Sequence, residues 1–463
     1  MPAVRFLLVN PWIHDFAAYD LWMRPLGLLQ LHAFLRQQGY EVDYLDALHL
    51  RPDDAQRWGL ERPEPRGDGR GKFHSQRIAK PPPYARIPRY YRRFGIPPGL
   101  LDEKLAALPH PDGILVTSGM TYWYPGVRET IRHLRKTFSQ NAAGAKQAAG
   151  SGSPPIFLGG TYATLCTDHA RRHSGADRVI PGPWETNLLP VLAGTFGLDC
   201  TRRDLSLDDL PFAANDLYPG SPTAAVRLTR GCPFSCDYCA SDRLSAGFHT
   251  RSPDRFADEV EWNVAGGRTE IALYDDALLV DADRALIPAL EEILRRDLPC
   301  HFHTPNGLHA RYMTGRIARL FRRTGFRTVR LSFESVRGRA RETSDGKAEP
   351  EDLSRAMDAL LAAGYGPGEI DVYMLIGLPE QREEAIRETA QFIHSVGGKI
   401  RPAQYSPVPA TPLFEKDKKR IEGLAEEPLL NNSTIAPGWN FETERYEELK
   451  RFVRGLNKGL KSK

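Results

Sequence analysis

Hydrophobic and polar positions form two repeating series along the chain, one in each half of the sequence. In the first half, short apolar runs alternate with segments whose apolar residues have helical spacing. The runs that predict strands are residues 4–10, 41–47, 113–119, 155–160 and 176–182, and the segments that predict helices are 25–40, 128–138 and 184–194. Because strands that alternate with helices form parallel sheets, residues 1–195 are expected to fold as a Rossmann-like open parallel sheet.

One segment of this half, residues 50–108, breaks the pattern. It is rich in Arg, Pro and Gly and shows little periodicity. Within it, residues 62–95 hold ten Lys or Arg residues and two acidic residues, with aromatic side chains between them. We therefore predict an irregular basic insertion. It either contacts an anionic substrate or RNA, or forms a solvated, proline-stiffened cover over an active site.

A second α/β series follows the irregular, acidic residues 196–220, which we interpret as a connector. Its predicted strands are residues 224–230, 270–276, 300–304, 328–335, 370–378 and 401–408. A helical segment follows each of the first five strands. Six such steps predict a partial (β/α)6 barrel of the TIM type over residues 221–415, shorter than the full eightfold barrel. Residues 416–463 are charged and predict a small helical C-terminal region.

Net charge and hydropathy exclude some classes of function. The 62 basic and 58 acidic side chains give a net charge of +4, which argues against a dedicated nucleic-acid binder. No apolar run reaches the roughly 18 residues of a membrane span, and the first residues predict a β-strand and not a signal peptide. We therefore expect a cytoplasmic protein without a membrane span or a nucleic-acid partner.

Three of the six cysteines lie close together, as Cys232, Cys236 and Cys239 in a CxxxCxxC pattern. They follow the first predicted barrel strand, at the end where barrel active sites lie. Three thiolates can hold a 4Fe–4S cluster and leave one iron open to a small molecule. Structural zinc prefers four closed ligands, and the sequence offers His249 as a distant fourth but no second CxxC pair. The pattern favours an iron–sulfur cluster over zinc.

The CxxxCxxC pattern, with aromatic Tyr238 before its last cysteine, resembles the signature of the radical S-adenosylmethionine (SAM) superfamily. The resemblance implies that SAM binds the open iron and is cleaved to a 5′-deoxyadenosyl radical. The SAM contacts that it implies are Tyr238, Asp275, Asp276, Asn306, Ser332, Glu334 and Ile376. Asp275 and Asp276 replace a GGE-type segment of the family. Without a cofactor role, these aspartates would cap a helix, Asn306 would form a turn, and Glu334 would form an ion pair.

A Rossmann-like domain before such a barrel resembles the cobalamin-binding class of this superfamily. Residues 25–29, 159–161 and 182–185 are similar to its helix-entry and turn segments. The implied cobalamin contacts are Pro11, Trp12, Thr117, Ser118, Gly119, Gly159, Gly160 and Thr161. The sequence departs from the class because it has no DxHxxG motif, and His14 and Asp15 have the wrong order and spacing. A domain without cobalamin would serve substrate binding or dimerisation.

The sequence therefore predicts a radical SAM enzyme that methylates an unactivated carbon through methylcobalamin. The expected partners are a small-molecule substrate and a one-electron reductant such as flavodoxin or ferredoxin. Two alternatives stay open. One is a cobalamin-independent radical rearrangement or C–C bond formation, and the other is a non-enzymatic iron–sulfur electron carrier. Carriers usually ligate every iron of their cluster, so the missing fourth cysteine argues against the carrier.

Overall fold

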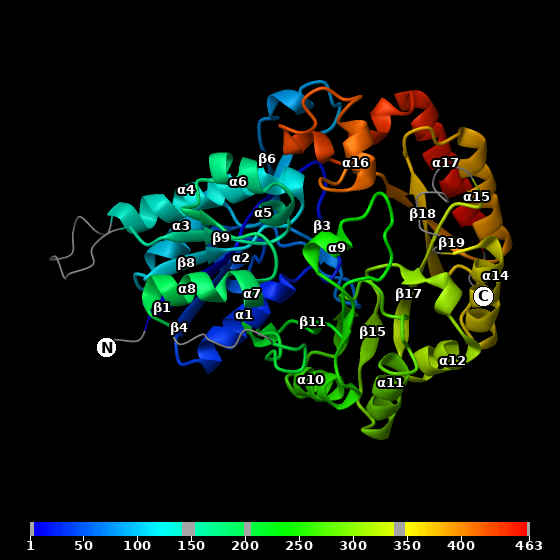
Figure 1. The fold of residues 1–463 in the computed structure, drawn as a ribbon, viewed down its shortest axis with the longest axis horizontal. Coiled ribbons are helices and arrows are strands. Elements are labelled where there is room, and N and C mark those ends of the chain that lie inside the picture. Colours follow the sequence, from blue (N-terminus) through cyan, green and yellow to red (C-terminus); the bar gives the residue numbers. More distant parts are fainter. Residues whose placement is uncertain (1–3, 141–152, 199–204, 338–347, 461–463) are drawn as a thin grey trace. The chain divides into compact units, whose positions relative to one another are not determined.

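The computed structural model describes residues 4–140, 153–198, 205–337 and 348–460, and Figure 1 shows their fold. The chain divides into two compact units. Unit 1 comprises residues 1–217 and 425–429, and unit 2 comprises residues 218–424 and 430–463. Within the described ranges, we find no helix with the length and apolar character needed to cross a membrane.

Unit 1 is built on a parallel sheet with the strand order β10-β9-β8-β1-β4. Its strands are β1 (Arg5–Asn10), β4 (Glu41–Asp46), β8 (Gly113–Val116), β9 (Ile156–Leu158) and β10 (Arg178–Val179). The principal helices are α1 (Leu26–Gln37), α4 (Tyr124–Gln140), α7 (Trp184–Asn187) and α8 (Leu189–Phe196), and Figure 1 shows helices on both faces of the sheet. The predicted Rossmann-like architecture is confirmed. The strand order reverses between β1 and β8, and ligands of such sheets bind at this switch point.

The core of unit 1 follows from the alternation of β1. Phe6 and Leu8 point to one face of the sheet and pack against Leu31 of α1 and Leu192 of α8. Leu7 and Val9, which alternate with them, are also almost fully buried. A strand that is buried on both faces reads as a continuous apolar run, which is why the sequence identified β1 so clearly.

The basic insertion is more ordered than its sequence pattern predicts. It contains α2 (Pro52–Trp58), β5 (Gly71–Lys72), β6 (Ser75–Arg77), β7 (Arg92–Phe94) and α3 (Pro98–Ala106). Strands β6 and β7 pair antiparallel and extend to β2 (Ile13–Asp15), while β5 pairs with β3 (Tyr19–Asp20). These elements are too short for hydrophobic periodicity to reveal them. The signals of α2 are its first residue, Pro52, and the left-handed Gly59 that ends it.

Segment 425–429 packs with unit 1 although it follows the barrel in the sequence. The hydroxyl of Tyr124 donates to the carboxylate of Glu427 at 3.2 Å. The buried hydroxyl of Tyr84 donates to the carbonyl of Leu429 at 2.8 Å. Both tyrosines are buried, so these bonds fix the segment to the interior of unit 1.

Unit 2 contains six parallel strands that follow one another in sequence order. They are β11 (Thr223–Val226), β14 (Glu270–Leu273), β15 (His301–His303), β17 (Phe326–Glu334), β18 (Ile370–Ile376) and β19 (Lys399–Gln404). The helices that follow the first five are α10 (Pro253–Ala265), α11 (Leu286–Arg295), α12 (Gly315–Arg323), α14 (Pro350–Ala362) and α15 (Glu383–Ser395). The predicted partial (β/α)6 barrel is confirmed, with β11 and β19 at its two ends.

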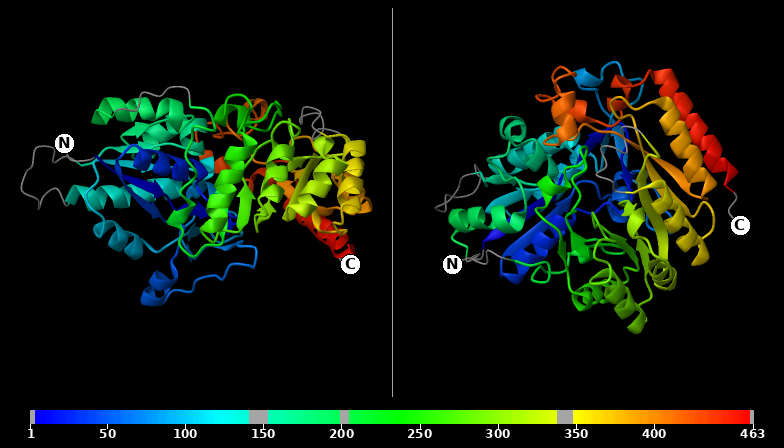
Figure 2. Two further views of the ribbon diagram at one scale, coloured as in Figure 1. Left: turned by 90° about the horizontal axis from the view of Figure 1, so that it is seen from below. Right: turned by 45° about the vertical axis from the view of Figure 1, so that its right-hand side comes forward.

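The helical C-terminal region supplies a sixth helix, α17 (Thr443–Gly459), which lies beside α15 (Figure 2). Leu449 and Val453 of α17 join the same core as the barrel strands. The amide of Asn457 accepts from the backbone N–H of Ile400 at 2.8 Å and donates to its carbonyl at 2.9 Å. Because β19 ends the sheet, these two bonds satisfy backbone groups of an edge strand.

The shorter elements include β12 (Thr229–Arg230), β13 (His249–Thr250), β16 (Leu308–His309), α5 (Thr161–Leu165), α6 (Thr167–His173), α9 (Ser241–Leu244) and α16 (Pro412–Asp417). The 3-10 helices include η1 (Pro82–Tyr84), η2 (Thr121–Trp123), η4 (Asn215–Leu217), η5 (Ala310–Tyr312), η6 (Pro428–Asn431) and η7 (Ala436–Trp439).

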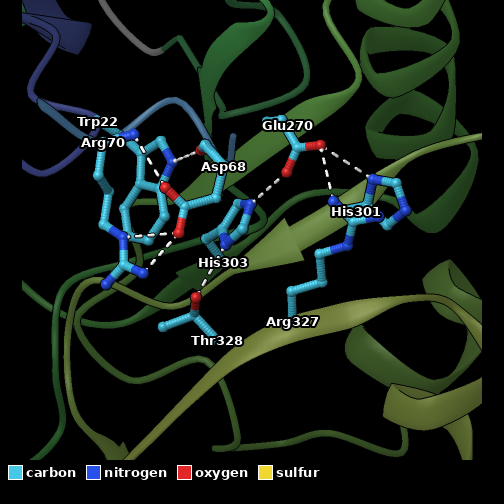
Figure 3. A network of polar contacts seen from close by, with 8 residues as sticks. All are labelled: Trp22, Asp68, Arg70, Glu270, His301, His303, Arg327 and Thr328. Atoms are coloured by element: carbon cyan, nitrogen blue, oxygen red, sulfur yellow. Dashed lines mark hydrogen bonds and ion pairs between the residues drawn. The ribbon is translucent and has the colours of Figure 1, made fainter. Parts of the chain in front are cut away.

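A polar network links three neighbouring barrel strands (Figure 3). The carboxylate of Glu270 is 2.7 Å from Nε2 of His303 and 3.0 Å from Nδ1 of His301, and Arg327 approaches it at 3.3 Å. The fully buried His303 also contacts the hydroxyl of Thr328 at 2.9 Å. Successive strand residues alternate in direction, and Phe302 packs into the core shared with the helices. His301 and His303 therefore face the inner side of the sheet.

Figure 3 also draws a contact group that belongs to unit 1. The indole N–H of Trp22 donates to the carbonyl of Asp68 at 2.7 Å, and the carboxylate of Asp68 pairs with Arg70. The guanidinium of Arg70 lies 5.2 Å from the centre of the Trp22 ring. These contacts order part of the insertion, where the sequence pattern predicted no regular structure.

Candidate functional site

The three-cysteine loop begins directly after β12, on the segment that leaves β11. Cys236 is 6% exposed, Cys232 is half-buried, and Cys239 is exposed. None of the three forms a disulfide. The N–H of Cys239 donates to the carbonyl of Cys236 at 3.0 Å, which closes a turn between them. The loop thus carries three reduced thiols that range from buried to solvent-accessible.

Gly231 sets the direction in which the chain enters the loop. Its φ is +82°, a region that favours glycine, and a Cβ at this position would lie 2.0 Å from the carbonyl oxygen of Gly247. Strand β12 pairs here with β13, which brings the two backbones together. Only glycine fits this contact without moving the backbone of the loop.

Aromatic side chains fix the loop to the barrel on two sides. The ring of Phe234 stacks on the buried ring of His309 in β16, with 4.8 Å between centroids. The ring of Tyr238 packs against Leu375, Leu378, Tyr405 and Leu413. The N–H of Leu413 also donates to the carbonyl of Asp237 at 2.9 Å. The loop is therefore held by β16, by the end of β18, and by α16.

Tyr238 also reaches Glu334, the last residue of β17. Its hydroxyl donates to Oε1 of Glu334 at 2.9 Å. Burial and the neighbouring carboxylate raise the pKa of Tyr238 well above its usual value. Glu334 is 8% exposed, has a φ of +62°, and lies at an irregularity in the pairing of β17 with β18. A strained, buried carboxylate at a barrel strand end is a feature of functional sites.

The two aspartates predicted to contact SAM lie directly after β14. Oδ1 of Asp275 accepts from the N–H of Leu228 at 3.1 Å, and from both the N–H and the hydroxyl of Thr229. Burial raises the pKa of Asp275 to about 6, although the hydrogen bonds from Thr229 oppose this shift. Asp276 is exposed, and its carboxylate accepts from the N–H of Gly231. Both carboxylates therefore contact the backbone that leads into the cysteine loop.

The other predicted SAM contacts lie at the ends of β15, β17 and β18. The exposed Asn306 donates from Nδ2 to the backbone carbonyl of Asp275 at 3.0 Å. Ser332 is buried. A Cβ added to Gly307 would lie 2.0 Å from the Ser332 hydroxyl oxygen. Ile376 points its side chain into the barrel core, so only its backbone faces the strand end. The structure joins Tyr238 to Glu334 and Asn306 to Asp275, and contact of these residues with SAM stays a prediction.

In unit 1, the ends of β8 and β9 meet through small residues. The hydroxyl of Ser118 donates to the carbonyl of Gly159 at 2.6 Å, and the N–H of Thr161 donates to the carbonyl of Ser118 at 2.8 Å. Gly160 has a φ of +92°, and a Cβ there would lie 2.3 Å from that carbonyl oxygen. Gly119 accepts from the N–H of Tyr162 at 3.1 Å. Five of the predicted cobalamin contacts thus form one tight backbone junction.

The remaining predicted cobalamin contacts differ in exposure. Trp12 is 1% exposed, and its indole N–H donates to the carbonyl of Ile96 at 2.8 Å. Pro11 is buried, and Thr117 is half-buried at the end of β8. Trp12 is therefore a core residue whose ring is covered by protein, while Thr117 stands at the strand end. Their contact with cobalamin stays a prediction.

His14 is held by protein groups in unit 1. Its Nε2 lies 3.0 Å from a carboxylate oxygen of Glu129. Burial lowers the pKa of His14, which favours the neutral imidazole. Although burial opposes the shift, hydrogen bonds from His14 and Arg93 lower the pKa of Glu129 to about 2. Asp15 accepts from the indole N–H of Trp123 at 2.8 Å. Both residues near the missing DxHxxG motif thus have structural partners.

Sequence reasoning overlooked two features of the site region. One is an HxxxH pair in unit 1, His169 and His173 of α6, whose ring centroids are 4.4 Å apart. Nδ1 of His169 contacts the hydroxyl of Tyr162 at 2.8 Å, and burial lowers its pKa to about 4. The spacing was visible in the sequence. The other is the stacking of Phe234 on His309, for which the sequence gives no signal because the two lie on separate elements.

Residues 226–393 match the family model of the radical SAM superfamily. The chain is also similar to an uncharacterised methyltransferase of Pyrococcus horikoshii, with 25% identity over 223 residues that cover 45% of this chain and 47% of that protein. It is 22% identical to the anaerobic magnesium-protoporphyrin IX monomethyl ester cyclase of Rubrivivax gelatinosus over 200 residues, 43% of this chain and 36% of the cyclase. The matches span about half of these curated relatives or less.

Two solved structures resemble nearly the whole chain. The radical SAM methyltransferase TsrM of Kitasatospora setae, with cobalamin and a [4Fe–4S] cluster bound, has a TM-score of 0.65 at 15% identity, covering 98% of this chain and 91% of TsrM. The cobalamin-dependent radical SAM enzyme OxsB has a TM-score of 0.57 at 12% identity, covering 98% of this chain and 56% of OxsB. At these identities the likeness shows a shared fold. The match of residues 226–393 identifies a radical SAM domain within this chain.

Proposed function

We propose that this chain is a radical SAM enzyme that methylates an unactivated carbon of a small molecule, with a 4Fe–4S cluster, SAM and cobalamin as cofactors. The observation that carries the proposal is the three-cysteine loop after β11, at the carboxyl end of a partial parallel barrel. The family match supports radical chemistry. The methyltransferase from P. horikoshii and the cobalamin-bound TsrM support methyl transfer.

The donor set of the loop fits an iron–sulfur cluster. Cys232, Cys236 and Cys239 lie on one short loop and form no disulfide, and thiolates are the ligands of such clusters. The exposed Cys239 contacts only a hydroxyl, Ser241 Oγ at 3.2 Å, among the contacts that we observe for its sulfur. The buried Cys236 gives the cluster a protected side. A three-thiolate set leaves one iron for SAM.

Held by Cys232, Cys236 and Cys239, a 4Fe–4S cluster would supply one-electron reduction of SAM, with the electron coming from a flavodoxin- or ferredoxin-like partner. The contribution of the chain is to hold the loop and to orient the substrate. Phe234 and Tyr238 anchor the loop on both sides. Glu334 offers a fixed carboxylate at a strand end where the resemblance expects a SAM contact, and the Tyr238 hydroxyl holds it in place.

The strand ends of unit 1 fit a flat macrocycle. Bound cobalamin would carry the methyl group. Ser118, Gly159 and Gly160 bring small side chains and a half-buried backbone to the edge beside the switch point. A Cβ on Gly159 would meet only one atom, the Ile180 carbonyl oxygen at 3.8 Å, so the space beside it is open. His14 is engaged by Glu129, so we propose binding that does not use it as a cobalt ligand.

The cluster is tested by anaerobic reconstitution of the wild-type chain and of Cys236→Ala, with Cys166→Ala as the matched control. Cys166 is a free cysteine outside the loop. Wild type and control should bind about four irons per chain, and Cys236→Ala should lose most of them and lose SAM cleavage. Full iron content and SAM cleavage in Cys236→Ala would refute the assignment.

Cobalamin is tested by titration with hydroxocobalamin, desalting and an absorbance spectrum. The wild type should retain about one equivalent, as expected for one switch-point site. Gly159→Leu should retain none, because its side chain fills the open space, while its iron content stays unchanged. Gly194→Ala in α8 is the control, since no atom lies within 4 Å of its added Cβ. No retention by wild type would favour a cobalamin-independent radical enzyme.

A further inference from the structure

The segment between β11 and the cysteine loop, residues 227–231, is bonded on both sides of its backbone. We call it the loop stem. On one side, Arg251 donates from its backbone N–H to the carbonyl of Leu228 at 2.9 Å and from Nη1 to the carbonyl of Arg227 at 3.1 Å. Arg251 also forms an ion pair with Glu259 of α10. The side chains of Arg251 and Glu259 are 3% and 1% exposed, so this support is rigid and buried.

On the other side, carboxylates at the end of β14 hold the N–H groups of the stem. Oδ1 of Asp275 accepts from Leu228, and from both the backbone and the hydroxyl of Thr229. Asp276 accepts from the N–H of Gly231, next to Cys232. Asn306 in turn donates to the backbone carbonyl of Asp275. The carboxylates at the end of β14 thus hold the stem, and Asn306 after β15 holds the backbone of Asp275.

Asp275 is the centre of this arrangement. It is 4% exposed, and one of its carboxylate oxygens accepts three hydrogen bonds from the stem. Its Oδ2 is buried and has no hydrogen-bond partner in the part of the chain that the structure describes. Burying a carboxylate costs free energy unless its hydrogen bonds offset that cost. The donors that we observe for the Asp275 side chain belong to the loop stem. Its carboxylate therefore stabilises the stem.

We infer that Asp275 is a positioning residue, whose carboxylate fixes the loop stem and thereby the direction in which the three cysteines are presented. Asp276 and Arg251 complete the same clamp. The inference rests on the proposed function, in which those cysteines hold a cluster. It assigns to Asp275 a role toward the chain's own backbone, where the resemblance predicted contact with SAM.

The direct test is hydrogen–deuterium exchange on the cluster-free, full-length chain, followed on peptides that cover residues 226–232. Asp275→Ala removes the acceptor and should speed exchange of the Leu228 and Thr229 amides by about tenfold or more, as expected for loss of charge-assisted hydrogen bonds. Asp275→Asn keeps a neutral oxygen acceptor at the same place, so exchange should rise less than in Asp275→Ala. The control is Asp283→Ala, whose carboxylate side chain is 92% exposed.

The spectroscopic arm uses the reconstituted chains. Asp275→Asn should retain the wild-type electron paramagnetic resonance spectrum of the reduced cluster and its change on adding SAM, whereas Asp275→Ala should alter both. Unchanged exchange in Asp275→Ala overturns the inference. The inference is also overturned if Asp275→Asn and Asp275→Ala lose SAM affinity equally. That result would mean that the charge of Asp275 contacts SAM.

Two further results distinguish failure of this inference from misfolding of a variant and from failure of the proposed function. If Asp275→Ala does not fold, Thr229→Val decides, because it removes only the hydroxyl donor to Asp275. Faster exchange at residues 228–231 in Thr229→Val supports the clamp, and unchanged exchange refutes it. If the wild type binds no cluster, the proposed function fails, while exchange in the cluster-free chain still decides whether Asp275 fixes the stem.

Discussion

Replacing Tyr238 by phenylalanine removes one hydroxyl and leaves the ring packed on Leu375 and Leu378. The hydroxyl donates to Glu334 at 2.9 Å, and Glu334 is 8% exposed. A hydrogen bond to a charged group contributes about 1.5–3 kcal/mol to stability. Glu334 also has a φ of +62°, a conformation that costs of order 1–3 kcal/mol in a non-glycine residue and persists only where its surroundings hold it. We therefore expect Tyr238→Phe to lower the free energy of unfolding of unit 2 by about 2 kcal/mol.

The assay is urea unfolding of the cluster-free chain, followed by tryptophan fluorescence and by circular dichroism. The matched control is Tyr446→Phe in α17, because the Tyr446 hydroxyl is buried and has no hydrogen-bond partner among the residues that the structure describes. Removing an unsatisfied buried hydroxyl should be neutral or stabilising by up to about 1 kcal/mol. Equal unfolding free energies for Tyr238→Phe and Tyr446→Phe would refute the view that Tyr238 holds Glu334.

Three further predictions concern the stem, the edge strand and pH. Gly231→Ala should reduce iron loading several-fold on reconstitution, because its Cβ would lie 2.0 Å from the Gly247 carbonyl oxygen; loading equal to that of Gly194→Ala would contradict this. Asn457→Ala should destabilise unit 2 by about 1–3 kcal/mol in a urea titration, because it removes both bonds to Ile400; a change no larger than that of an exposed substitution would contradict it. The pKa of Glu129 is lowered from 4.5 to about 2 in the folded chain. Its carboxylate should therefore contribute to the free energy of unfolding of unit 1 above pH 4.5, and this contribution should be lost as the pH falls toward 2. Unfolding measured between pH 6 and 2 should show this loss in wild type, and its persistence in Glu129→Gln would assign it to other groups.

The fold could be predicted largely from hydrophobic periodicity. Strands such as β1 and β18 are buried on both faces and read as continuous apolar runs. Their alternation with amphipathic helices indicated the two parallel architectures. The insertion could not be predicted in this way, because β5, β6 and β7 have two or three residues each. Such strands are specified by their pairing partners, which lie elsewhere in the chain.

The candidate site could likewise be predicted only in part. The spacing of Cys232, Cys236 and Cys239 placed a loop at the end of the first barrel strand, because the pattern is local in sequence. The contacts of Tyr238 with Glu334 and of Asp275 with Leu228 join residues that are 96 and 47 positions apart. No single sequence shows which of two acidic neighbours is buried. The structure does, with Asp275 buried and Asp276 exposed.

The structure also bears on the interpretation of His14. The sequence excluded it as a cobalt ligand because of its spacing. The structure gives a physical reason, since His14 is buried against Glu129 and its pKa is lowered by burial. We therefore propose that cobalamin binding by unit 1 depends on the small residues at the ends of β8 and β9.

The central claim is that three cysteines hold a 4Fe–4S cluster with one iron open to SAM. The most direct measurement is electron paramagnetic resonance of the anaerobically reconstituted, dithionite-reduced chain, recorded with and without SAM. The account predicts a 4Fe–4S signal in the wild type that changes when SAM is added, and its loss in Cys236→Ala. A chain that takes up zinc in place of iron, or a cluster signal that SAM leaves unchanged, would contradict the claim.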